Sequence, residues 1–169
     1  MRTKKINKVN TASCCSSGCC CGKKDEFSEK AVKCPICGKK GVSVKFDTVE
    51  SIIKKNKKVT LKESFYLCEN SDCDVLYFSD NSIFDVENSE VDIDFKKGAK
   101  TRYACYCNKL TYEEVKEIVK KHKKTDWTFI VKEAKGKIVK SDCIHKNPYG
   151  VCCASNSFKK AVEKAGLKF

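Results

Sequence analysis

The chain has 169 residues, of which 14 are cysteine, and a formal net charge of +13. Its length suits one compact domain of ordinary size or two small ones. Residues 1–9 are basic but lack the apolar core of a signal peptide, and no apolar run reaches the length that crosses a bilayer. We therefore expect a cytoplasmic protein without membrane insertion, whose reduced thiols bind metals rather than form a disulfide scaffold.

The positive charge comes mainly from lysines spread along the chain. Arginine is the better reader of phosphates and base edges, so this composition does not favour a nucleic-acid partner. Metal ligation deprotonates thiols. A zinc ion, or an oxidised two-iron, two-sulfide cluster, held by four thiolates has a net charge of about −2, so two such sites would lower the formal charge of the protein to about +9. The sequence contains no Ser-His-Asp set, phosphate-binding loop or H-E-x-x-H motif, which excludes the usual hydrolase and kinase signatures.

Residues 1–32 are predicted to form a flexible head, because they contain too few apolar side chains to pack. Five cysteines stand in a Ser- and Gly-rich stretch of this head: Cys14, Cys15, Cys19, Cys20 and Cys21. Thiolates prefer soft ions such as Cu+ and Zn2+. The cluster therefore predicts a site of soft-metal capture; the alternative is a tail whose thiols have no specific function.

Residues 33–100 are predicted to form a zinc-binding β unit. The sequence C-P-x-C-G at 34–38 is a tight turn that points Cys34 and Cys37 at one metal, and Cys68 and Cys73 supply a second pair about thirty residues later. Two such pairs complete a tetrahedral site of the structural zinc type. Four thiolates leave no open coordination position, so we assign this site to scaffolding rather than catalysis.

The pattern around the two cysteine pairs is mostly that of a small antiparallel sheet. Val42, Val44 and Phe46 alternate in the manner of a strand. A short helix with Val49, Ile52 and Ile53 on its buried face is expected to begin at Thr48 as N-cap. Further strands are predicted, from their aromatic and β-branched residues, at 64–67, 75–78, 83–86 and 91–95.

Residues 101–169 are predicted to form a small helical unit, which makes the fold class α+β. Thr111 is expected to cap a helix that runs to His122, with glutamates in its first turn. A second helix is predicted from Thr125 to about Ile138, and a last one after a cap at Ser155 or Asn156.

A second set of thiols brackets this helical unit. Cys105 and Cys107 form a C-x-C pair, Cys143 lies 36 residues further on, and Cys152 and Cys153 follow the turn made by Pro148 and Gly150. Two ferric ions bridged by sulfide need four terminal ligands, usually thiolates. The set therefore predicts a [2Fe-2S] cluster on the C-x-C pair, Cys143 and one of the last two cysteines. The alternative is a second zinc site on the same thiols.

Four motifs occur in a characteristic order: C-P-x-C-G at 34–38, the stretch 66–78 around the second pair, Cys105-Tyr106-Cys107, and N-P-x-G-x-C-C at 147–153. Together they resemble the N-terminal metal-binding region of CopZ-type copper chaperones, also described as iron–sulfur cluster-binding metallochaperones, over about residues 30–165.

The resemblance implies zinc on Cys34, Cys37, Cys68 and Cys73. It also implies a [2Fe-2S] cluster on Cys105, Cys107, Cys143 and Cys153, in a unit similar to bacterioferritin-associated ferredoxins. Cys152 is then a free thiol beside the cluster or an alternative cluster ligand.

We therefore expect a metallochaperone for soft metals, copper first, whose cluster reduces Cu(II) to Cu+ before thiols pass the metal on. It is not expected to be an enzyme beyond such metal-ion reduction. The resemblance implies a metal-transporting ATPase or a separate heavy-metal-associated carrier domain as partner, and leaves the electron donor open. Full-length members add a copper-binding Met-x-Cys-x-x-Cys motif, which these 169 residues lack because Met1 is their only methionine.

Two other functions are compatible with the motifs. The first is a [2Fe-2S] electron carrier or redox sensor that transfers no metal. The second is a zinc-ribbon protein that binds nucleic acid through its positive charge, with strongly salt-dependent affinity and no colour.

Overall fold

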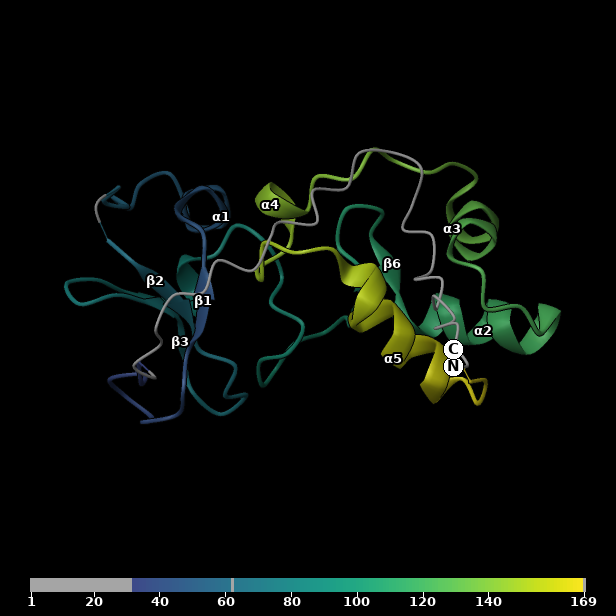
Figure 1. Ribbon diagram of the computed structural model, residues 1–169, viewed down its shortest axis with the longest axis horizontal. Coiled ribbons are helices and arrows are strands. Elements are labelled where there is room, and N and C mark those ends of the chain that lie inside the picture. Colours follow the sequence, from purple (N-terminus) through teal and green to yellow (C-terminus); the bar gives the residue numbers. More distant parts are fainter. Residues whose placement is uncertain (1–31, 62, 169) are drawn as a thin grey trace, which may run out of the picture.

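The structure, a computed structural model, describes residues 32–61 and 63–168 (Figure 1). It has an N-terminal lobe (residues 32–100), built on a small sheet, and a mainly helical C-terminal lobe (residues 101–168). This mixed architecture agrees with the predicted α+β class. The elements are β1 Val42–Val44, α1 Phe46–Ile52, β2 Phe65–Leu67, β3 Val75–Phe78, β4 Ile83–Asp85, η1 Val86–Asn88, β5 Tyr103–Cys105, β6 Leu110–Thr111, α2 Tyr112–His122, α3 Trp127–Lys135, α4 Cys143–Lys146, η2 Cys153–Ser155 and α5 Ser157–Lys164.

The N-terminal lobe is a four-stranded antiparallel sheet with strand order β1-β2-β3-β4, in which Val42 pairs with Leu67 and Tyr66 with Phe78. All four residues of β3 are buried, because both faces of this strand are covered. One face contributes Leu76 and Tyr77 to a core that also contains the buried side of α1. The other packs against the four thiols of the first cysteine set.

Three predictions for this lobe are wrong. Phe46, predicted to continue the strand of Val42 and Val44, is the first residue of α1. Helix α1 begins at Phe46 after Lys45, so Thr48 is not its N-cap but a fully buried residue within its first turns. Residues 91–95 form no strand although their apolar residues alternate, because the chain turns there instead of pairing with β4. Asp94 and Phe95 lie in this turn, and its Ile93 side chain is buried in the core.

The C-terminal lobe packs α2, α3 and α5 around the β5–β6 hairpin. The predicted cap at Thr111 is confirmed: its side chain accepts from the Glu114 amide, and Glu114 bonds back to the Thr111 amide. Helix α3 begins after Asp126 rather than at Thr125, and it ends at Lys135, before the C-cap Gly136, whose φ of 73° is left-handed. Ile138 therefore lies outside the helix, contrary to the prediction, because the left-handed cap stops helical hydrogen bonding.

A loop of the C-terminal lobe crosses to the N-terminal lobe. Helix α4 packs against α1, and Figure 1 shows it between α1 and the helices of the C-terminal lobe. Pro148 and Tyr149 follow α4 in the chain. The Pro148 carbonyl accepts a 2.7 Å hydrogen bond from the Tyr77 hydroxyl of β3, and Tyr149 packs against the core of the N-terminal lobe. The chain segment between Cys143 and Cys153 is thus shaped by the lobe to which it does not belong in sequence.

Within the part of the chain that is described, no helix is long and apolar enough to cross a bilayer.

Candidate metal centres

The first cysteine set forms a compact group. The sulfurs of Cys34, Cys37, Cys68 and Cys73 all lie within 4.8 Å of one another, with 4.0 Å between Cys34 and Cys73 and 3.6 Å between Cys37 and Cys68. A tetrahedral zinc ion with bonds of about 2.3 Å holds its sulfurs about 3.8 Å apart. The four residues therefore fit one Zn2+ ion, and three of them are buried.

The backbone of the C-P-x-C-G turn explains its local chemistry. Gly38 adopts a φ of 69°, which a side chain would disfavour, and its amide donates to the Cys34 carbonyl. The Lys39 amide donates to the Cys37 sulfur and is the main reason why the pKa of this thiol falls to about 6. Burial instead raises the pKa of Cys68 to about 12. Metal binding must displace protons from the buried thiols, so the affinity falls as the pH falls.

Lys96 is a contributor that sequence reasoning missed. Its ammonium group is buried, with 6% of the residue exposed, and it donates to three carbonyls of the second turn: Asn70 at 2.9 Å, Cys73 at 2.9 Å and Val75 at 2.7 Å. This places a positive charge beside a site whose zinc-bound form carries two negative charges. No local sequence signal distinguishes this lysine from its exposed neighbour Lys97.

The second set is arranged differently. Cys105 and Cys107 are buried at the β5–β6 hairpin, Cys143 opens α4, and Cys153 opens η2. The Cys107 and Cys143 sulfurs lie 3.7 Å apart. Among the described residues, only the first set is a group of three or more ligand atoms placed to hold one ion, and the second set is not. The thiols thus do not converge on a single ion.

Nitrogen donors surround the sulfurs of the second set. The Asn108 amide group donates to Cys105 at 3.5 Å, the Asp142 backbone N–H to Cys107 at 3.3 Å, and the Asn147 amide group to Cys153 at 3.3 Å. Both asparagines are buried. Neither side chain was predicted from the sequence, in which the N-P turn at 147–148 is a local signal for Asn147 alone.

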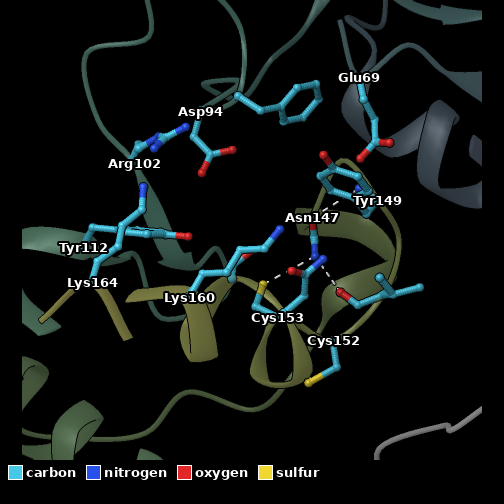
Figure 2. Close-up of a pocket in the computed structure, with 14 residues that line it drawn as sticks. Glu69, Asp94, Arg102, Tyr112, Asn147, Tyr149, Cys152, Cys153, Lys160 and Lys164 are labelled. Atoms are coloured by element: carbon cyan, nitrogen blue, oxygen red, sulfur yellow. Dashed lines mark hydrogen bonds between the residues drawn. The ribbon is translucent and has the colours of Figure 1, made fainter. Parts of the chain in front are cut away.

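Cys152 and Cys153 differ in their surroundings. Cys153 is buried, and its pKa is raised by the hydrogen bond with Cys105 and by burial. Figure 2 shows its sulfur on the side of Asn147, while the Cys152 sulfur points to a different side of the loop. Cys152 is half-buried and, with Cys107, raises the pKa of Cys143 through hydrogen bonding between the thiols. Both thiols therefore lie near the second set, and Cys153 is the more enclosed.

A cavity of about 330 Å³ borders Cys153 (Figure 2). Arg102, Lys160 and Lys164 line one side of it, and both Arg102 and Lys164 lie close to the ring of Tyr112, at 5.9 and 5.5 Å from its centroid. Glu69 and Asp94 also line the cavity, so its basic residues gather on one side, where positive charge attracts negatively charged groups.

Gly150 fixes the approach of the loop that carries Cys153. Its φ is 66°, and a Cβ atom there would lie 2.4 Å from the Thr48 hydroxyl oxygen of α1. Only glycine satisfies both the left-handed backbone and this contact.

The expected capture cysteines Cys14, Cys15, Cys19, Cys20 and Cys21 lie outside the described residues.

Comparisons with known proteins point in one direction. Residues 31–90 match the profile of the zinc-binding domain zf_CopZ. The chain is 30% identical over 122 residues to the copper chaperone CopZ of Archaeoglobus fulgidus. These residues make up 72% of this chain and 58% of that protein, so the chain spans little more than half the length of the curated relative.

A solved structure has a similar fold. The X-ray structure of the N-terminal domain of CopZ from Archaeoglobus fulgidus superposes with a TM-score of 0.60 at 25% sequence identity, covering 82% of this chain and all of that domain. The chain therefore contains a CopZ-type zinc-binding region and is homologous to the copper chaperone CopZ.

Proposed function

We propose that the protein belongs to the CopZ-type metallochaperones and handles soft metals, copper first, with one structural zinc site and one [2Fe-2S] cluster. The observation that carries the proposal is the presence of two four-cysteine sets with different geometries. The proposed zinc ligands are Cys34, Cys37, Cys68 and Cys73. The proposed cluster ligands are Cys105, Cys107, Cys143 and Cys153.

The extended arrangement of the sulfurs supports a two-metal centre at the second set. Each iron of a [2Fe-2S] cluster takes two terminal thiolates, so ligands are close within a pair and further apart between pairs. Cys107 lies 3.7 Å from Cys143 and neighbours Cys105, which in turn neighbours Cys153, so the four thiols form an extended row. A single zinc ion would instead require all four sulfurs to converge, as they do in the first set.

The residues around the second set suit a redox site. N–H donors to three of its sulfurs stabilise the more negative, reduced state of a cluster and so raise its reduction potential. When bound, the cluster would supply one electron, which converts Cu(II) to Cu+, the form that soft thiolates prefer. An external one-electron donor must then restore that electron. Arg102, Lys160 and Lys164, on one side of the adjoining cavity, favour an acidic protein for this step.

Cargo copper would be held by thiols outside the two resident sites. Cys152 lies beside the proposed cluster, and the five cysteines between Cys14 and Cys21 supply further soft ligands. By homology to a copper chaperone, the recipient would be a metal-transporting ATPase or a separate carrier domain.

The test begins with anaerobically purified protein. We expect about one zinc and two irons per chain, a visible absorption spectrum that bleaches on reduction, and uptake of Cu+ beyond these metals in competition with a Cu+ chelator. Serine variants at Cys105, Cys107, Cys143 and Cys153 should lose the colour, whereas Cys152→Ser should keep it. A colourless protein that holds two zinc ions would refute the cluster.

An electron carrier that transfers no metal is the second candidate, favoured by the same hydrogen-bonded sulfurs. Deletion of residues 1–32 separates the two functions. The metallochaperone should lose most of its Cu+ uptake while it keeps its colour. A carrier should retain its spectrum and potential and take up no Cu+ with or without these residues.

A further inference from the structure

We propose that residues 94–96, called the clasp below, couple the two metal centres. Zinc at the first centre then positions the loops that carry the ligands of the second centre. The identity of the metals in this proposal rests on the proposed function. Each of the three consecutive residues contacts a different metal-bearing loop. The clasp lies in the turn that sequence alternation wrongly predicted as a strand.

Lys96 holds the first centre. Its ammonium group donates to the carbonyls of Asn70, Cys73 and Val75, which belong to the turn that carries the second cysteine pair. The three carbonyls can accept from one ammonium group only if the turn keeps its shape. A metal bound by Cys68 and Cys73 together with Cys34 and Cys37 maintains that shape. A zinc site with four thiolates also gives the buried cation a negative neighbour.

Asp94 holds the C-x-C hairpin of the second centre. One carboxylate oxygen accepts a 2.7 Å hydrogen bond from the Tyr106 hydroxyl, and the other accepts from the Tyr103 amide at 3.1 Å. Tyr106 stands between Cys105 and Cys107, and its side chain is largely buried. A shift of Asp94 would therefore move the backbone that presents both thiols.

Phe95 holds the remaining loop. Its ring packs against Tyr149 with 5.2 Å between the centroids, and Tyr149 lies four residues before Cys153. The backbone N–H of Lys96 donates to the Ile93 carbonyl, and the Ile93 side chain is buried, so the three residues move as one short turn. Release of Lys96 would thus loosen both parts of the second centre together.

The first test needs no cluster. The 169-residue protein is prepared metal-free and loaded with zinc alone, and amide hydrogen exchange is measured over residues 103–107. We expect zinc to slow exchange there by about tenfold, within the range typical of coupled sites. Lys97→Met changes the exposed neighbour and should show the same slowing. In Lys96→Met, zinc should slow exchange by less than about twofold.

A second variant keeps the test decisive if Lys96→Met does not fold. Asp94→Asn leaves the contacts of Lys96 untouched but presents an N–H group where the carboxylate accepted hydrogen bonds. Zinc should still bind, yet it should no longer slow exchange over 103–107. Equal exchange with and without zinc in the wild type would overturn the proposal. It would also be overturned if zinc slowed exchange over residues 103–107 as much in Lys96→Met or Asp94→Asn as in Lys97→Met.

The second test uses the protein with both metals. Removal of zinc by a chelator should hasten the loss of visible absorbance in the wild type and in Lys97→Met, and should change that rate little in Asp94→Asn. If the wild type shows no visible absorbance, the proposed cluster fails, while the exchange measurement still decides whether the clasp exists.

Discussion

Substitution of Gly150 by alanine tests how the loop of Cys153 is held. Two features oppose the new methyl group: the backbone φ of 66°, and the Thr48 side chain of α1, whose hydroxyl oxygen would lie 2.4 Å from the added Cβ. Because Thr48 is fully buried, it has no open space into which to move. The loop or the helix must therefore shift by about 1 Å to restore ordinary contact.

The two features contribute separately to the cost. A left-handed φ on alanine destabilises by about 1 kcal/mol relative to glycine. Forcing a methyl group into a packed contact costs about 1–3 kcal/mol more. The expected loss in the free energy of unfolding is thus about 2–4 kcal/mol, together with a lower cluster content, because Cys153 follows three residues later.

Urea denaturation followed by circular dichroism measures this loss, and Gly136→Ala is the matched control. Gly136 also has a positive φ, of 73°, but no atom lies within 4 Å of its would-be Cβ, so only the backbone cost of about 1 kcal/mol applies. In a Thr48→Ala background the hydroxyl oxygen and the methyl group are gone and only the Cβ, at 3.3 Å, remains, so Gly150→Ala should cost little more than Gly136→Ala. Equal losses for Gly150→Ala and Gly136→Ala in the wild-type background would refute the reasoning.

Three further substitutions address other contacts. Glu114→Gln should lower the free energy of unfolding by about 1 kcal/mol at pH 7, because Glu114 bonds the Thr111 amide and, at 2.5 Å, Lys135. Burial raises the pKa of Glu114, but the bonds from Lys135 and Thr111 outweigh it and lower the pKa, so this stability is present above the unfolded pKa. In acid denaturation series, the difference from the wild type should begin to shrink below the unfolded pKa of about 4.3 and should vanish once the pH falls below the folded pKa. The exposed Glu113→Gln should show little difference at any pH. Tyr77→Phe should cost about 1–3 kcal/mol in urea, because it leaves the Pro148 carbonyl without its donor, and a cost no larger than that of Tyr66→Phe would argue against this bond. Asn147→Ala should lower the reduction potential of the proposed cluster by about 40 mV, which a spectroscopic redox titration would measure. This shift corresponds to the loss of one hydrogen bond of about 1 kcal/mol in a one-electron reduction. An unchanged potential would contradict a role of Asn147 in setting the potential.

Features encoded within a few residues could be predicted from the sequence. The C-P-x-C-G turn needs only its own residues to close, and the structure brings Cys34 and Cys37 together with the other pair. The capping box of Thr111 and Glu114 is likewise local, since both partners lie within one turn of the helix. Strands β2 and β3 were recognisable because buried strands consist of apolar and aromatic residues.

Features that depend on contacts between distant residues could not be predicted. The alternation of Val91, Ile93 and Phe95 satisfies the pattern of a strand, yet the pattern contains no information about whether a partner strand is available. Lys96 and Lys97 are identical in sequence terms, and only the folded turn decides which of them is buried. The donors Asn108 and Asn147 belong to the same class, because their significance comes from sulfurs that other segments contribute.

The choice between zinc and a two-iron cluster at the second set depends on such distant contacts as well. Spacing along the chain identifies the thiols, but the distances between Cys107, Cys143 and Cys153 depend on how the loop between the last two is placed. That placement is set by the N-terminal lobe, through the bond from Tyr77 and the contact of Gly150 with Thr48. Because the loop is held from outside, the positions of its cysteines depend on how the lobes dock. A variant that releases the loop, such as Tyr77→Phe, should therefore shift the second centre toward binding zinc, which metal analysis of the purified protein would detect.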